Sequence, residues 1–174
     1  MIVHLYQPGA IFGERCFLPA AQRYFATALE DSEVLDMSPV RLLEQVRNRP
    51  DTLPGLLGEL SGRLAATDDA LQAFVSDSVD VRLGAQLLAL ASASPADGEW
   101  LDLPHGFGHE EFAQMLGVHR ETVTRAIGNL KKLGVIATAG RRSIRIHCNQ
   151  MRRFLGDQNS RRESVQHHMT DARL

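Results

Sequence analysis

Residues 109–147 read HEEFAQMLGVHRETVTRAIGNLKKLGVIATAGRRSIRIH, and no other stretch is as informative about the fold. Apolar residues on one face predict a two-turn helix over 109–116, and Gly117 ends it because glycine readily adopts the left-handed conformation. A second helix begins at about residues 119–121, and its apolar back consists of Val123, Ile127 and Leu130. A short helix, a glycine turn and a second helix are the pattern of a helix-turn-helix.

The front of the second helix carries side chains that can read base edges in a DNA major groove: Arg120, Glu121, Thr124 and Arg125. Arginine suits guanine O6 and N7 in a two-pronged contact, and glutamate can accept from cytosine N4. Glu121 and Arg125 are also spaced for an ion pair along the helix, and both interpretations can hold together.

Two strands, over 135–138 and 143–147, predict a hairpin after the second helix. Its tip carries Arg141 and Arg142, so the hairpin is a basic wing suited to phosphate. Lys131 and Lys132, at the end of the second helix, are further candidates for phosphate contacts. The whole ordered series is far more specific than one amphipathic helix.

Charge is unevenly distributed along the 174 residues. Residues 105–155 contain nine Lys and Arg against three acids, which gives +6, whereas the net charge of the chain is −2. The other residues therefore carry −8. A basic block on an acidic background indicates a polyanionic partner for that block alone.

A heptad pattern precedes the motif, on a helix that starts at residue 51 or 52. Its apolar seam has alternating spacings of four and three and one polar member; it consists of Leu53, Leu57, Leu60, Leu64, Thr67, Leu71 and Phe74. This spacing predicts a dimeric coiled coil. The alternative is a helix that packs on the core of its own domain.

We divide the chain into four segments. Residues 1–37 contain four candidate short strands, residues 38–76 hold the helical segment, residues 77–155 hold the helix-turn-helix and wing, and residues 156–174 form a polar tail that we expect to be disordered. Ser38 and Pro39 are suited to begin a helix. A helix over 78–94 and a strand over 100–103 complete the expected elements.

Composition excludes several classes of protein. Apolar residues make up 44% and charged residues 23%, as in a globular protein, and no run is long enough for a membrane span. Two distant cysteines, Cys16 and Cys148, exclude a disulfide scaffold and a cysteine metal site. No phosphate-cradling loop, metal-ligand spacing or nucleophile constellation is present. We therefore expect a cytoplasmic protein that is not an enzyme and carries no cofactor.

The motif resembles the winged helix of the cAMP receptor protein/FNR family of bacterial transcription regulators. The similarity extends to the N-terminal side, where Pro8-Gly9 and Phe12-Gly13-Glu14 resemble the end of that family's sensory β-roll. The resemblance implies an α+β fold, with part of a cyclic-nucleotide-binding-like β-roll, a long dimerisation helix and a C-terminal winged helix-turn-helix domain. The resemblance also implies that the first residues of this sequence correspond to a point about two-thirds of the way through the β-roll.

The resemblance also implies roles for individual residues. Arg120, Glu121 and Arg125 match the base-reading positions, and the arginine at 120 favours a TGTGA-like half-site. Thr122 matches a phosphate-contacting position. His119 stands where the family usually has a capping Ser or Thr, and we expect it to donate to a phosphate instead.

The expected function is therefore that of a sequence-specific transcription regulator. It would bind a pseudo-palindromic operator in double-stranded DNA as a homodimer, with RNA polymerase as an expected partner and no role at a membrane. Cyclic AMP is not expected to bind, because Gly13-Glu14 is followed by Arg23-Tyr24 and not by Arg with a small hydroxyl residue. The alternative is a ligand-responsive module whose winged helix binds protein.

Overall fold

The computed structural model describes residues 2–18, 24–91, 99–103, 107–139 and 143–158. The chain divides into two compact units, one over residues 4–72 and one that combines residues 1–3 with residues 73–174. The described elements are helices and one three-stranded antiparallel sheet, which confirms the α+β class. No helix within these ranges is long and apolar enough to cross a lipid bilayer.

The unit over residues 4–72 begins as irregular chain. Its described residues before Ser38 hold one 3-10 helix, η1 (Glu14–Phe17), and no strand, so the prediction of strands over 1–36 is wrong for these residues. A strand is stable when its backbone N–H and C=O groups pair with a neighbouring strand, and the described residues of this unit offer none. Apolar side chains such as Phe25 and Leu35 are therefore exposed.

Helices form the rest of this unit. The α1 helix (Pro39–Asn48) begins as expected, with the Ser38 hydroxyl accepting the Arg41 N–H at 3.3 Å and proline at the first helical position. A 3-10 turn, η2 (Pro50–Thr52), then leads into α2 (Leu53–Ser76). The predicted long helix is thus confirmed.

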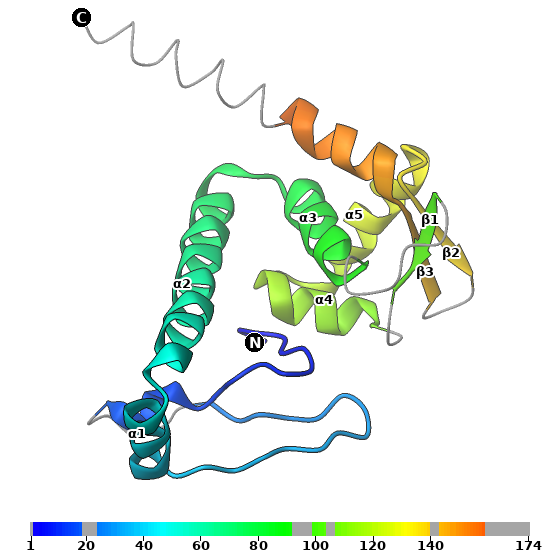
Figure 1. Ribbon diagram of the computed structural model, residues 1–174. Helices are drawn as coiled ribbons and strands as arrows, with labels where there is room; N and C mark the ends of the chain where they lie inside the picture. Colours follow the sequence, from blue (N-terminus) through cyan, green and yellow to red (C-terminus); the bar gives the residue numbers. More distant parts are fainter. Residues whose placement is uncertain (1, 19–23, 92–98, 104–106, 140–142, 159–174) are drawn as a thin grey trace, which may run out of the picture. The chain divides into compact units, whose positions relative to one another are not determined.

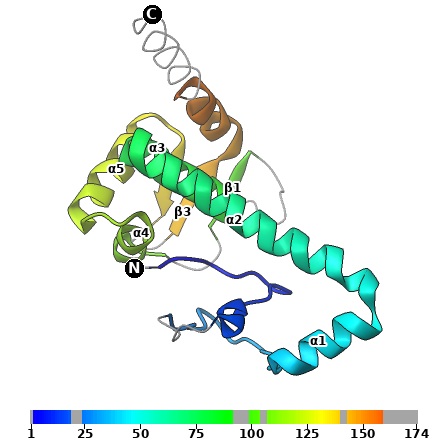
Figure 2. The ribbon, with the colours of Figure 1, turned by 90° about the vertical axis from the view of Figure 1, so that its left-hand side faces the viewer.

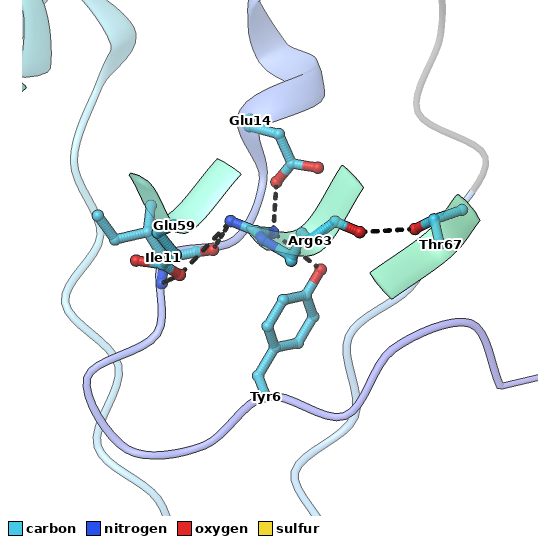
Figure 3. Close-up of polar contacts among 6 residues, drawn as sticks. All are labelled: Tyr6, Ile11, Glu14, Glu59, Arg63 and Thr67. Carbon is cyan, nitrogen blue, oxygen red and sulfur yellow. Dashed lines mark hydrogen bonds and ion pairs between the residues drawn. The ribbon is translucent and has the colours of Figure 1, made fainter. Parts of the chain in front are cut away.

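Arg63 of α2 joins the irregular N-terminal chain to the helix (Figure 3). Its guanidinium lies 3.2 Å from the Glu14 carboxylate and 3.5 Å from that of Glu59, and it donates to the Ile11 carbonyl oxygen at 2.6 Å. The Tyr6 hydroxyl lies 3.5 Å from the same group. The Glu59 carboxylate also accepts the Ile11 N–H at 2.9 Å. One arginine therefore attaches the chain around residues 6–14 to α2.

The α2 helix runs as one long helix (Figure 2). None of its residues is buried. All seam residues of the heptad pattern are exposed except Leu60, which is half-buried; Leu64 and Leu71 are 65% and 63% exposed. Gly55, Gly58 and Gly62 face open space. A helix that packed on its own domain would bury this seam, whereas the described residues leave most of this apolar stripe exposed.

The other unit combines several helices with a small sheet (Figure 1). Its helices are α3 (Val79–Ala91), α4 (His109–Leu116) and α5 (Arg120–Lys132). Its strands are β1 (Trp100–Asp102), β2 (Ile136–Ala139) and β3 (Ser143–His147), in the order β1-β3-β2 with both pairs antiparallel. The predicted helices and strands of this region are confirmed, except that residues 92–94 and the wing tip 140–142 lie outside the described residues.

The core of this unit lies between the helices and the sheet. Its largest fully buried side chains come from every layer: Leu83, Leu87, Phe112, Val123, Leu130, Ile146 and Met151. In β3, burial alternates as far as Ile146, as expected for a strand with one face on the core. This packing holds α4 and α5 in fixed positions relative to the strands.

A further helix over residues 148–158 follows β3 directly, so the prediction of a disordered tail is wrong for residues 156–158. It packs on α3 at Gly84, where an added Cβ would lie 3.0 Å from the Met151 sulfur and 3.5 Å from Leu155. Because glycine removes a side chain at this point, the two helices approach closely. The rest of the expected tail, 159–174, lies outside the described residues.

Candidate nucleic-acid interface

The turn between α4 and α5 is closed by the backbone. Gly117 adopts the left-handed conformation with φ of 65°, as predicted, and the Val118 N–H donates to the Ala113 carbonyl oxygen at 3.1 Å. At the start of α4, the Glu111 carboxylate accepts the Gly108 N–H at 2.8 Å. This contact compensates for the missing capping hydroxyl.

The α5 helix has two distinct faces. Its buried residues are Val123, Ala126, Ile127 and Leu130, the three predicted ones and one more. At 100° per residue, the exposed residues occupy the opposite arc; they are Arg120, Glu121, Thr124, Arg125, Lys131 and Lys132. Helix α5 therefore turns one polar, mostly basic face to solvent.

The two arginines of this face form no ion pair with a described residue. Among the described residues, none pairs with Arg120 or Arg125 within 4 Å, and Glu121 does not bridge to Arg125 at i+4. Their guanidinium groups keep all their donors for a partner. A guanidinium group can donate two parallel hydrogen bonds, either to a phosphate or to O6 and N7 of guanine.

Thr124 differs from its neighbours because its hydroxyl already has partners. The oxygen lies 2.8 Å from His109 Nδ1 of α4 and 3.0 Å from the Arg120 carbonyl oxygen. Sequence reasoning missed His109 as a member of this group. His109 and Thr124 are fifteen residues apart in the sequence. Their contact depends on how α4 packs against α5, so no local sequence pattern predicts it.

The phosphate candidates have different surroundings. His119 is exposed at the N-cap of α5 and makes no capping bond through its side chain, while Thr122 is half-buried. Lys131 Nζ donates to the Thr138 hydroxyl of β2 at 2.9 Å, so this cation is held toward the wing. Lys132 is exposed. Arg141 and Arg142 lie outside the described residues.

Side chains of α3 hold the motif in place. Arg82 donates to the Leu116 carbonyl oxygen at the end of α4, and its guanidinium lies 4.7 Å from the centroid of the Phe74 ring. Burial lowers the pKa of Arg82, and the charge of Asp77 opposes this shift. Asp80 accepts from the Asn129 amide of α5 at 2.9 Å. Helix α3 therefore contacts both helices of the motif through polar side chains.

Comparison with protein families finds a Crp-like helix-turn-helix domain over residues 81–151. Among curated proteins, the chain is 31% identical over 136 residues to a CRP-like cAMP-activated global transcriptional regulator of Mycobacterium tuberculosis, covering 77% of this chain and 61% of the relative. It is also 31% identical to the transcriptional regulator SdrP of Thermus thermophilus, covering 78% and 64%. The chain thus spans about three fifths of the length of these relatives.

Solved structures agree with this fold. A CRP/FNR-family transcriptional regulator from Thermus thermophilus matches with a TM-score of 0.53 and 26% identity, covering 62% of this chain and 55% of that one. A mutant of CooA from Carboxydothermus hydrogenoformans matches with a TM-score of 0.59 and 21% identity, covering 67% and 54%. The helix-turn-helix with its basic face, the matched domain and these relatives lead to one conclusion: residues 81–151 form a Crp-like helix-turn-helix domain, and the chain is similar to transcription regulators of the CRP/FNR family.

Proposed function

We propose that this chain is a sequence-specific DNA-binding regulator that reads its operator with the exposed face of α5. The observation that carries the proposal is the separation of faces on α5, with four buried apolar residues behind and, in front, Arg120 and Arg125, which form no ion pair with any residue that the structure describes. A helix of this kind enters a major groove with its N-terminal residues toward the base edges. RNA polymerase is then the partner through which a bound regulator acts.

Base reading and phosphate binding would fall to different residues. Arg120, Glu121 and Arg125 would supply specificity at a TGTGA-like half-site. Affinity would come from phosphate contacts that carry no sequence information; their candidates are His119, Thr122, Lys131, Lys132, Arg141 and Arg142. The Lys131 contact with Thr138 supports this division, because it holds one cation between α5 and the wing.

The operator would be pseudo-palindromic, since we propose a homodimer joined through α2. The uncovered heptad seam of α2 supports this, because a second copy offers the same stripe and would bury both. Two motifs related by a two-fold axis contact half-sites about 34 Å apart, one turn of DNA.

We further propose that binding does not need cyclic AMP. Glu14, the acid of the Gly13-Glu14 pair, is engaged by Arg63 at 3.2 Å. Downstream, Tyr24 places an exposed ring where the family has a small hydroxyl residue, and the Arg15 guanidinium lies 5.0 Å from its centroid. The relative from Mycobacterium tuberculosis is named as a cAMP-activated regulator, and that name describes only the relative.

Fluorescence anisotropy over a salt series tests the proposal with the full chain. A duplex with two TGTGA-like half-sites at one-turn spacing is compared with a scrambled duplex, with and without cyclic AMP. We expect at least a hundredfold preference for the operator without nucleotide, and a steep fall of affinity with salt. Equal affinity for both duplexes under all conditions would refute base reading by this face, and binding only with cyclic AMP would refute the nucleotide-independent part.

A further inference from the structure

The Thr124 hydroxyl uses its one hydrogen within the protein. Its oxygen contacts the Arg120 carbonyl oxygen at 3.0 Å and His109 Nδ1 at 2.8 Å. A carbonyl oxygen can only accept, so the hydroxyl donates to Arg120. His109 must then donate from Nδ1, because two acceptors facing each other at 2.8 Å would repel. Both contacts are satisfied only when His109 carries a proton on Nδ1.

This arrangement limits what Thr124 can offer a base. The hydroxyl has no hydrogen left for acceptors such as purine N7 or thymine O4. Its oxygen keeps one acceptor lone pair, which suits only a base donor such as adenine N6 or cytosine N4, and thymine presents no donor in the major groove. The remaining part of this exposed side chain is the γ-methyl group. In the major groove, the C5 methyl of thymine distinguishes that base from the other three, and the methyl of threonine packs against it.

We infer that Thr124 selects thymine through its γ-methyl group and that His109 is the positioning residue that holds Thr124 for this contact. The inference rests on the proposed function, since it names one base preference of the same face.

The hydrogen bond from His109 positions Thr124 because it favours one χ1 rotamer of the threonine. In a helix, threonine divides between two χ1 rotamers, because its hydroxyl can bond the carbonyl oxygen one turn back in either. The bond to Arg120 alone therefore does not select one. A donor on α4, fixed at 2.8 Å from the hydroxyl, favours the rotamer that points the oxygen at α4. Loss of this donor frees the side chain to rotate and moves the methyl.

Deoxyuridine substitution tests the inference, because it removes only the C5 methyl of thymine. In the operator duplex, each thymine is replaced in turn, symmetrically in both half-sites, and anisotropy is measured with the full chain. We expect one position at which affinity falls about fourfold per half-site, the effect of burying one methyl group. Thr124→Ser keeps the hydroxyl but lacks the γ-methyl group, so deoxyuridine at that position should not lower its affinity. Thr124→Val keeps a γ-methyl group, so deoxyuridine at that position should still lower its affinity.

The role of His109 has its own variants. His109→Ala should reduce the deoxyuridine effect at this one position, and His109→Asn, which places an amide donor near the Nδ1 position, should restore it. A role in folding alone would not change the response to one methyl group on the DNA. The same deoxyuridine profile for wild type and Thr124→Ser would overturn the inference. No preference for the operator over scrambled DNA would overturn the proposed function itself, and the inference with it.

Discussion

Replacing Arg125 by alanine separates specific from general DNA binding. Its guanidinium is exposed on α5 and has no ion pair among the described residues. Removal should therefore change the free energy of unfolding by no more than about 0.5 kcal/mol. The loss then falls on binding, and a thermal melt that matches the wild type is the first control.

The magnitude follows from the two-fold symmetry of the proposed complex. A two-pronged contact between arginine and guanine contributes about 1–3 kcal/mol of discrimination. A dimer loses this contact in both half-sites, so the loss is about 2–6 kcal/mol. With about 1.4 kcal/mol for each factor of ten, affinity for the operator should fall by about 30-fold to 10⁴-fold. Affinity for scrambled DNA should fall far less.

The assay is anisotropy on the operator and on duplexes with each half-site base pair changed in turn. Arg125→Ala should become indifferent to one base pair while it still discriminates the others. Arg152→Ala is the matched control, because it removes the same charge from an exposed site on the helix over 148–158. Equal losses on operator and scrambled DNA for Arg125→Ala would refute the assignment of Arg125 to base reading.

Other substitutions test the dimer, the core and the helix cap. Leu64→Glu places a charge on the exposed seam of α2 and should give a monomer by analytical ultracentrifugation, whereas Ala65→Glu, off the seam, should leave the dimer intact; a dimer with both would contradict the coiled coil. Phe112→Ala removes a fully buried ring and should lower the free energy of unfolding by about 3–5 kcal/mol in denaturant titration; a cost below about 1 kcal/mol would mean that α4 does not anchor this core. His119→Ser adds a capping hydroxyl where the present N-cap makes no side-chain bond and should raise stability by about 0.5–1 kcal/mol, and an unchanged melting temperature would count against this geometry.

Most of the helix-turn-helix could be predicted from the sequence, because its signals are local. The apolar residues of α5 recur with helical spacing, and the whole buried face follows from that period. Gly117 predicts the turn, since a helix that ends in a left-handed residue favours one tolerant of positive φ at that position. The α2 seam is visible for the same reason, and its exposure in the single chain agrees with the heptad pattern.

Tertiary structure decided the rest. The strands expected over 1–36 are absent from the described residues because a strand requires hydrogen bonds from a partner, which no local pattern supplies. The helix over 148–158 was not predicted because its sequence is largely polar. Its few apolar side chains, Met151 and Leu155 among them, contact α3 at Gly84. The bond from His109 to Thr124 depends on the packing of α4 against α5. Sequence patterns report the face that a residue occupies within its own element, whereas contacts between elements arise only when their faces pack together.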